Sequence, residues 1–201
     1  SLDYGGQWKL LHYLAKRFFN PINVVAIPDG ETIIIKGMND GPAPADISLE
    51  ITLAAVTGAT TSLKRLSVSL GLESASELAR IPLEAVGEGQ FLVLEWRDTA
   101  GNLIGQNDFF PRAYKYYDLP DATINAHWDT ENDAAVLTME TDEPAFFVSA
   151  QVDEPGYFSD NCLTMLPGQK ARLKFTPRKG ANPSLDDLKA SRKISHLAQT
   201  F

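Results

Sequence analysis

The sequence predicts an all-β protein in which one α-helix precedes two consecutive antiparallel β-sandwiches. Three observations lead to this prediction. Apolar residues recur at the three-and-four spacing of a helix face only near the start, in residues 7–20. After Pro21 they recur at every second residue, as in strands with one buried face. Gly and Pro then interrupt these runs about every 8 to 12 residues, which is the spacing typical of antiparallel sandwiches.

The predicted helix ends at Asn20, because a residue before proline disfavours helical backbone angles. Gly5 and Gly6 precede it. Its apolar face consists of Trp8, Leu11, Leu14, Ala15 and Phe18. A helix of this length is marginal in water on its own. The helix must therefore fray, lean on the first sandwich, or bury its apolar face against a second copy of the chain.

The first predicted sandwich covers residues 22–118. Two short β-rich runs, residues 24–27 and 32–35, flank the turn sequence PDGE. Residues 46–56 alternate cleanly, residues 63–72 repeat the pattern, and residues 91–110 read as a hairpin. Residues 77–86 contain Pro82, which disfavours a long helix, and are expected to form one helical turn or an irregular crossover.

The second predicted sandwich covers residues 121–201, after a polar and aromatic boundary at residues 112–122. Ser184 and Asp187 resemble a helix capping box, so a short helical turn is expected before a last strand at residues 194–200. Strands are expected at residues 123–129, 134–141, 145–153, 163–167 and 171–177. Each sandwich has about 80 to 100 residues, the size of an immunoglobulin-like module. The predicted fold is therefore two immunoglobulin-like antiparallel β-sandwiches preceded by one α-helix.

The overall charge argues against a nucleic-acid partner. The 201 residues carry a formal charge of -8, whereas phosphate backbones require Lys and Arg patches. No apolar run reaches the length of a membrane span. The single cysteine, Cys162, rules out an internal disulfide and fits a cytoplasmic, periplasmic or secreted chain alike.

The titratable residues do not predict a catalytic, cofactor or metal site. His12, His127 and His196 do not stand at metal-ligand spacing, and Cys162 has no sequence signal for a base. Residues 129–140, DTENDAAVLTME, imitate a calcium loop, but Ala134 replaces the required glycine, so a hairpin turn is favoured. The acidic pairs lie in turns where solvated acids are ordinary: Asp142 and Glu143, Asp153 and Glu154, Asp186 and Asp187.

Tryptophans can stack on sugar rings, but they serve more often in a core or an interface. This applies to Trp8, Trp96 and Trp128, among which Trp128 is the best sugar-stacking candidate.

Two stretches, residues 1–22 and residues 155–161 (PGYFSDN), resemble the β-mannosidases of glycoside hydrolase family 2. The opening SLDYGGQWKLLHYLAKRFFNPI is similar to the final helix of their catalytic barrel. The matching residues are Ser1, Tyr4, Gly6, Trp8, Lys9, Leu11, His12, Tyr13, residues 16–19 and Pro21. Residues 155–161 resemble the Pro-Gly-x-Phe-Ser-Asp-Asn signature of the same enzymes' C-terminal sandwich. Cys162 and Leu163 depart from the aromatic residues that often follow it.

The resemblance implies that residues 1–21 are the last helix of a (β/α)8 barrel that this chain does not contain. The parent enzyme would hydrolyse terminal β-D-mannosyl residues with retention, and its two catalytic glutamates would lie in that barrel. The partners implied are the barrel of the same polypeptide and a carbohydrate substrate. This chain alone is expected to be an inactive, cofactor-free accessory region.

The resemblance also nominates motif residues and contacts with the barrel, namely Trp8, Leu11, Tyr13, Phe158, Ser159, Asp160 and Asn161. For Ser159, Asp160 and Asn161 the residue types favour fixing a loop over binding a sugar. Two alternatives stay open. One is a stand-alone carbohydrate-binding or adhesion-type sandwich, and the other is the same region of a related enzyme such as an exo-β-glucosaminidase.

Overall fold

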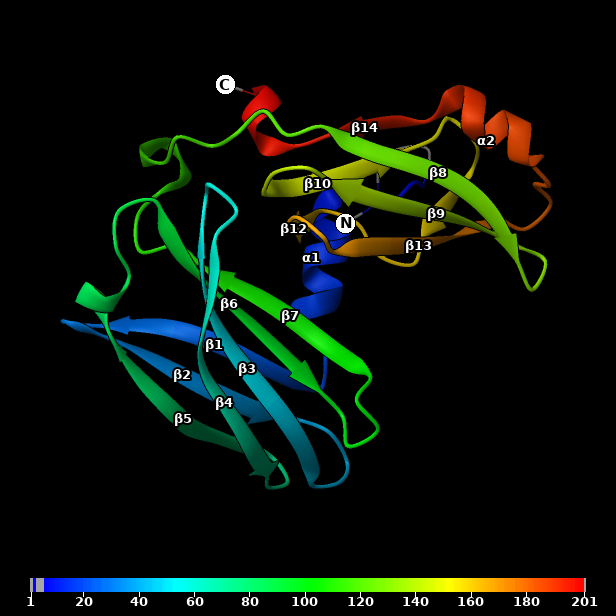
Figure 1. Ribbon diagram of the computed structural model, residues 1–201. Coiled ribbons are helices and arrows are strands. Elements are labelled where there is room, and N and C mark those ends of the chain that lie inside the picture. The colour runs from blue at the N-terminus through cyan, green and yellow to red at the C-terminus, as the bar shows by residue number, and fades with distance from the viewer. Residues whose placement is uncertain (1, 3–5, 201) are drawn as a thin grey trace. The chain divides into compact units, whose positions relative to one another are not determined.

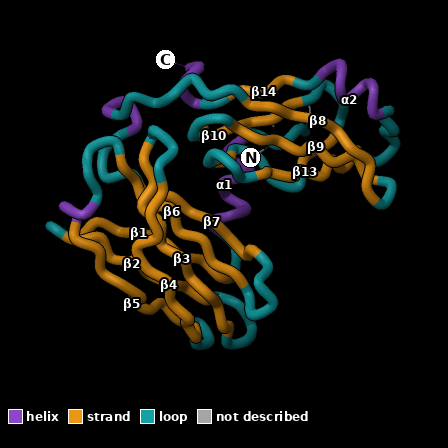
Figure 2. Tube along the Cα trace, in the orientation of Figure 1, coloured by secondary structure: helices purple, strands orange, loops and turns teal. Residues whose placement is uncertain are grey.

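The computed structural model describes residues 2 and 6–200, and it divides into two compact units (Figure 1). The first sandwich is the unit Arg17–Asp118, and the second sandwich joins residues 119–201 to residues 1–16. Strands dominate both units (Figure 2). Ser1, Tyr4 and Gly5 of the predicted motif lie outside the described residues.

The first sandwich is built from two antiparallel sheets. One has the strand order β1-β2-β5 and the other β4-β3-β6-β7. Two 3-10 turns, η1 (Leu83–Ala85) and η2 (Tyr114–Tyr116), belong to this unit. Its strands are β1 (Ile22–Asp29), β2 (Thr32–Asn39), β3 (Ala45–Ala55), β4 (Thr60–Leu70), β5 (Ser74–Pro82), β6 (Gln90–Arg97) and β7 (Leu103–Phe109).

The period of two in the sequence explains the core of the first sandwich. Along β3, Ile47, Leu49 and Ile51 are buried, while Asp46 before them and Ser48 between them are exposed. The same core contains Ile33 and Ile35 of β2, in the other sheet, and Leu92 and Leu94 of β6, which pairs with β3; all four are fully enclosed. Burial of each such side chain is worth about 1.5 to 3 kcal/mol, so this alternation fixes which face of each strand turns inward.

The second sandwich also has two antiparallel sheets, of order β11-β13-β9-β8 and β12-β10-β14. Its strands are β8 (Ile124–Glu131), β9 (Ala134–Thr141), β10 (Ala145–Gln151), β11 (Gly156–Phe158), β12 (Leu163–Met165), β13 (Lys170–Pro177) and β14 (Lys193–Ser195). A seven-residue helix, α2 (Leu185–Ser191), and a 3-10 turn, η3 (Leu197–Thr200), complete it. The all-β prediction of two antiparallel sandwiches after one helix is confirmed.

Three local expectations need correction. Residues 74–82 form strand β5, paired with β2 over its whole length, and the expected helical turn is confined to η1. Strand β11 was not expected. The last strand ends at Ser195 rather than Thr200, because the chain turns into η3. The capping box of α2 is present, with the Ser184 side chain accepting from the Asp187 amide.

Helix α1 spans Leu10–Phe18, a shorter range than residues 7–20. Residues before it form an isolated bridge between Leu2 and Trp8. The predicted apolar face also differs, because Trp8 precedes the helix and the buried helical residue is Tyr13. Tyr13 joins the core of the second sandwich, whereas the expected alternatives were fraying, leaning on the first sandwich or self-association. Whether residues 1–21 end a barrel stays a prediction.

Neither helix of the described residues has the length and apolar character needed to cross a membrane.

Candidate functional site

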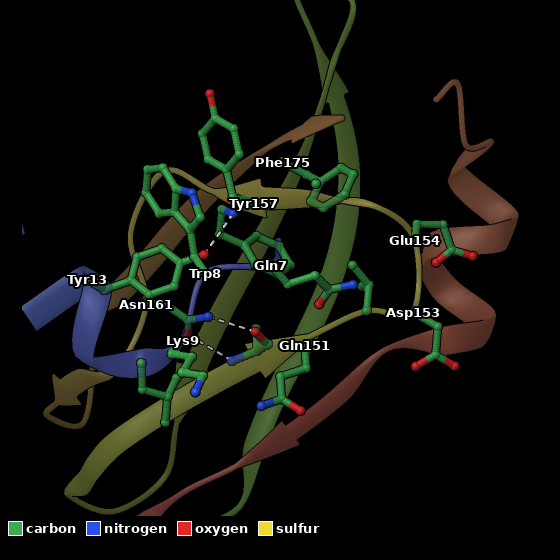
Figure 3. A pocket seen from close by; sticks show the side chains of 15 residues that line it. Gln7, Trp8, Lys9, Tyr13, Gln151, Asp153, Glu154, Tyr157, Asn161 and Phe175 are labelled. Atoms are coloured by element: carbon green, nitrogen blue, oxygen red, sulfur yellow. Dashed lines mark hydrogen bonds between the residues drawn. The ribbon is translucent and has the colours of Figure 1, made fainter. Parts of the chain in front are cut away.

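A pocket of about 360 Å³ opens within the second sandwich, where the segment before α1 meets strands β10 and β11 (Figure 3). Residues 7–10 and Tyr13 form one wall, and residues 150–157 form much of the other. Phe158, Asn161 and Phe175 complete the lining. Four predicted residues therefore line one pocket: Trp8, Tyr13, Phe158 and Asn161.

Trp8 occupies the pocket wall as part of an aromatic cluster. Its indole stacks on the Tyr157 ring, with centroids 4.3 Å apart and planes 9° from parallel. His12 lies 4.1 Å from the indole centroid and Tyr13 lies 5.3 Å from it. These rings hold the N-terminal segment against β11, so packing accounts for the position of Trp8.

Tyr13 connects the helix to the far side of the pocket. Only 3% of the residue is exposed, and its hydroxyl accepts a hydrogen bond of 3.2 Å from the Phe158 amide. Burial raises the pKa of the Tyr13 phenol, against the opposing effects of hydrogen bonds with the Phe158 backbone and the Asn161 side chain. The phenol therefore stays protonated and keeps its hydrogen-bonding role at neutral pH.

Asn161 bridges the loop to β10. Its amide group donates to the Ala150 carbonyl at 2.7 Å and accepts from the Ala150 amide at 2.9 Å, as the dashed lines in Figure 3 show. The same side-chain oxygen accepts from the Cys162 amide at 3.0 Å. Asn161 is 3% exposed, so these bonds satisfy backbone groups that water does not reach. Cys162 itself adopts a left-handed backbone angle, φ 58°.

Ser159 and Asp160 also bond to backbone groups. The Ser159 hydroxyl accepts from the Lys174 amide at 3.0 Å, and the Ser159 amide donates to the Lys174 carbonyl at 2.7 Å. The Asp160 carboxylate accepts from the Asn161 amide at 2.8 Å. These bonds have the geometry of loop fixing. A contact of these residues with a barrel or a sugar stays a prediction.

Lys16 belongs to the motif residues 16–19, but its place at this site was not predicted. Its ammonium donates to the Ser159 carbonyl at 2.8 Å. Lys16 stands three residues after Tyr13, a spacing that places both side chains on neighbouring parts of one helix surface. Together, Tyr13 and Lys16 bond to consecutive residues of the 158–161 loop, the segment of residues 158 to 161.

The acidic side chains at the pocket rim are engaged elsewhere. Glu154 accepts from the Ser191 hydroxyl at 2.8 Å, and Asp153 pairs with Lys193 at 3.3 Å. Figure 3 shows both carboxylates on the side of α2, away from Tyr13. Glycoside hydrolysis needs two carboxyl groups facing one sugar, so these two do not form such a pair.

The calcium-like stretch forms the hairpin between β8 and β9. Asn132 and Asp133 make a two-residue turn with φ angles of 46° and 60°. Its acids have separate partners: Asp129 lies 3.2 Å from His127, Glu131 pairs with Arg172, and Glu140 pairs with Lys170 at 2.7 Å. The hairpin alternative is therefore correct. Within residues 2 and 6–200, no group of three or more potential ligands could hold a metal ion.

A second candidate surface is an apolar stripe on α1. Leu11 and Phe18 are 59% and 62% exposed, and their spacing of seven residues places them on one side of the helix. The half-buried Leu14 and Ala15 lie between them on the same side. We call these four residues the α1 stripe. Leu11 does not line the pocket, unlike the nominated residues Trp8, Tyr13, Phe158 and Asn161.

The comparisons by sequence match this chain to mannosidases. An Ig-fold domain family of mannosidases, Ig_mannosidase, matches residues 119–200. Goat (Capra hircus) beta-mannosidase is 29% identical over 215 residues, covering 100% of this chain and 24% of the goat protein. Mouse (Mus musculus) beta-mannosidase is 48% identical over a 40-residue stretch that covers 20% of this chain and 5% of the mouse protein.

Solved structures share the fold. The beta-D-mannosidase of Dictyoglomus thermophilum superposes with a TM-score of 0.84 at 23% identity, covering 97% of this chain and 24% of that one. The Amycolatopsis orientalis exo-chitosanase CsxA gives a TM-score of 0.69 at 17% identity, covering 92% of this chain and 26% of that one. The chain spans about a quarter of the length of the full-length curated relatives that it matches.

Proposed function

We propose that this chain is the accessory region of a larger β-mannosidase-like exo-glycosidase. Residues 119–200 match the Ig-fold domain family of mannosidases, and the whole chain is homologous to the C-terminal immunoglobulin-like region of beta-mannosidases. The parent would hydrolyse terminal β-D-mannosyl residues with retention, using two carboxyl groups of a catalytic barrel. This region would brace the barrel and leave the chemistry to it. The described residues hold two sandwiches and no barrel.

The α1 stripe is the observation that supports this proposal. A nine-residue helix has one side in the core of the second sandwich, through Tyr13, and leaves Leu11 and Phe18 largely exposed on another. Full burial of each such side chain contributes about 1.5 to 3 kcal/mol. The stripe is therefore the surface on which the catalytic barrel of the same polypeptide would dock.

The decisive experiment uses the full-length polypeptide. Leu11→Glu and Phe18→Glu should lower the temperature at which hydrolysis of 4-nitrophenyl β-D-mannoside is lost, because each places a charge against the docked barrel. Leu72→Glu is the matched control, since Leu72 is 52% exposed and lies in the first sandwich outside α1. Equal inactivation temperatures for all three variants would reject the docking role of the stripe.

The same preparation separates the two sugar preferences. The exo-chitosanase structure has a similar fold, so an exo-β-glucosaminidase parent is the second candidate. Preferential hydrolysis of a β-D-glucosaminide over a β-D-mannoside would select it. A full-length gene without a barrel, whose product binds a β-mannan but does not cleave it, would select the stand-alone carbohydrate-binding sandwich.

In the isolated chain the stripe is free to meet a second copy. We expect mass measured by light scattering to rise with concentration and Leu11→Glu to keep the chain monomeric. A wild-type chain that stays monomeric up to millimolar concentration would exclude self-association through the helix and leave the accessory role unaffected.

A further inference from the structure

Helix α1 depends on partners outside itself. It has nine residues, and helices of this length are marginal in water without tertiary contacts. Within the second sandwich those contacts include Tyr13, which enters the core, and Lys16, which bonds to the Ser159 carbonyl. They also include His12, which packs on the Trp8 ring. The order of the helix is therefore tied to the residues that these side chains hold.

The contacts of α1 with the sandwich and the α1 stripe occupy different sides of the helix. At 3.6 residues per turn, Tyr13 lies about 200° around the helix from Leu11, and Phe18 returns to within about 20° of it. Lys16 lies about 60° from Tyr13. A partner on the stripe would leave the bonds of Tyr13 and Lys16 in place.

The 158–161 loop is the part of the second sandwich that these bonds reach. Tyr13 accepts from the Phe158 amide, and Lys16 donates to the Ser159 carbonyl. Next along the chain, Cys162 holds a left-handed angle that costs a non-glycine residue about 1 to 3 kcal/mol. A strained segment of this kind keeps its conformation only while its surroundings enforce it.

We propose that α1 couples the stripe to the 158–161 loop. Covering the stripe stabilises the helix, and the stabilised helix fixes the loop through Tyr13 and Lys16. By the reciprocity of linked equilibria, fixing the loop in turn favours a helix that presents the stripe. The inference rests on the proposed function only in naming the catalytic barrel as the cover, and the coupling itself is a property of this chain.

Amide hydrogen exchange on the 201-residue chain tests the contact. Tyr13→Phe removes only the hydroxyl, so the Phe158 amide should exchange at least tenfold faster. Tyr157→Phe is the control, because its hydroxyl points away from Tyr13 in Figure 3 and its loss should leave the Phe158 amide unchanged. An unchanged exchange rate of the Phe158 amide in Tyr13→Phe would contradict the role of the Tyr13 hydroxyl in holding the 158–161 loop.

A pair of variants at Leu14 tests the coupling without touching the loop. Leu14→Ala and Leu14→Gly both remove the half-buried side chain and differ chiefly in helix propensity. The amides of residues 158–161 should exchange about fivefold faster in the glycine variant than in the alanine variant. The reason is that the equilibrium constant for forming the helix is lower by about the same factor with glycine. The amides of β3 serve as the internal reference for an intact first sandwich.

Equal exchange of the loop in the two Leu14 variants would refute the coupling. That outcome would leave the proposed function standing, because the barrel could still dock on the stripe. Conversely, coupling found in this chain together with a full-length enzyme insensitive to Leu11→Glu would refute the docking and keep the coupling.

Discussion

At the scale of single residues, Asn161 matters through the backbone groups that it satisfies. One buried amide group bonds both polar atoms of Ala150 and the amide of Cys162. A buried polar group left without a partner costs about 1 to 3 kcal/mol, whereas the bond itself contributes only about 1 kcal/mol net. Removing this side chain therefore costs more than its bonds contribute.

We expect Asn161→Ala to lower the free energy of unfolding of the second sandwich by about 3 kcal/mol. Asn182→Ala, at an exposed asparagine of the same unit, should change it by less than about 0.5 kcal/mol. Urea unfolding followed by tryptophan fluorescence measures both. Similar midpoints for the two variants would show that the Asn161 bridge is dispensable.

Gly156 is required for close packing of β11 on β13. A Cβ added there would lie 2.4 Å from the Phe175 ring and 2.6 Å from the Thr176 carbonyl oxygen. Gly156→Ala should cost about 2 to 3 kcal/mol, because a backbone atom cannot move aside as a flexible side chain can. At Gly71, an added Cβ would have its nearest neighbouring atom at 3.8 Å. Gly71→Ala should therefore leave the thermal unfolding midpoint of the first sandwich nearly unchanged.

At the scale of elements, α2 shows how one carboxylate starts a helix. The Asp187 carboxylate accepts from the Ser184 hydroxyl at 2.7 Å and from the Ser184 amide at 2.8 Å, and these bonds lower the pKa of Asp187 below its ordinary value of 3.8. The folded state therefore favours the ionised form. The stabilisation is complete above that ordinary value and is lost as pH falls through the lower folded pKa.

We expect the amides of α2 to lose protection in the wild-type chain as the pH falls below the ordinary Asp187 pKa of 3.8 and through its lower folded pKa. Asp187→Asn should remove this pH dependence, while Asp186→Asn, whose side chain is 93% exposed, should keep it. Hydrogen exchange measured across this pH range checks the sign. Protection that rises on acidification would contradict the capping role.

At the scale of the whole molecule, the chain has two cores with separate membership. Leu94 belongs to the core of the first sandwich and Leu137 to that of the second, and both are fully enclosed. Each substitution to alanine should cost about 2 to 5 kcal/mol. Because the cores are distinct, each should lower one calorimetric transition and leave the other in place, and a shift of both transitions by one substitution would show a single cooperative unit.

The isolated chain should not hydrolyse an activated aryl β-mannoside. The acids of the pocket rim are bonded to Ser191 and Lys193, so they do not form the facing pair that the reaction requires. Sensitive fluorogenic assays with the purified chain measure this. Turnover that survives repeated purification and disappears in Glu154→Gln would show that a catalytic site had been overlooked.

Local patterns predicted much of the secondary structure, and they failed where partners lie far away in sequence. Residues 77–86 were expected to form one helical turn or an irregular crossover, since Pro82 disfavours a long helix. Instead, residues 74–82 pair with β2, about forty residues earlier, and Pro82 is tolerated as the last residue of an edge strand. Strand β11 has only three residues and pairs with β13, so no period could reveal it.

The candidate site was predictable in composition but not in arrangement. The motif residues near Trp8 and those near Asn161 were nominated separately, and nothing local showed that they meet across about 145 residues of chain. Lys16 was named only within the motif residues 16–19, and only the fold gives it the Ser159 carbonyl as a partner. Tyr13 was nominated by its motif, although its burial in a distant sandwich was not.

By itself, the sequence determined the fold class, the helix near the start and most strands, because periodicity and turn chemistry act between neighbouring residues. Two motifs added the resemblance to β-mannosidases. Only the tertiary structure decided that Tyr13 of α1 enters the core of the second sandwich and that Leu11 stays exposed. Those outcomes depend on the shape of a core into which Tyr13 fits, and a core is made by residues that are remote in the chain. The α1 stripe is the part of the helix that this packing leaves uncovered.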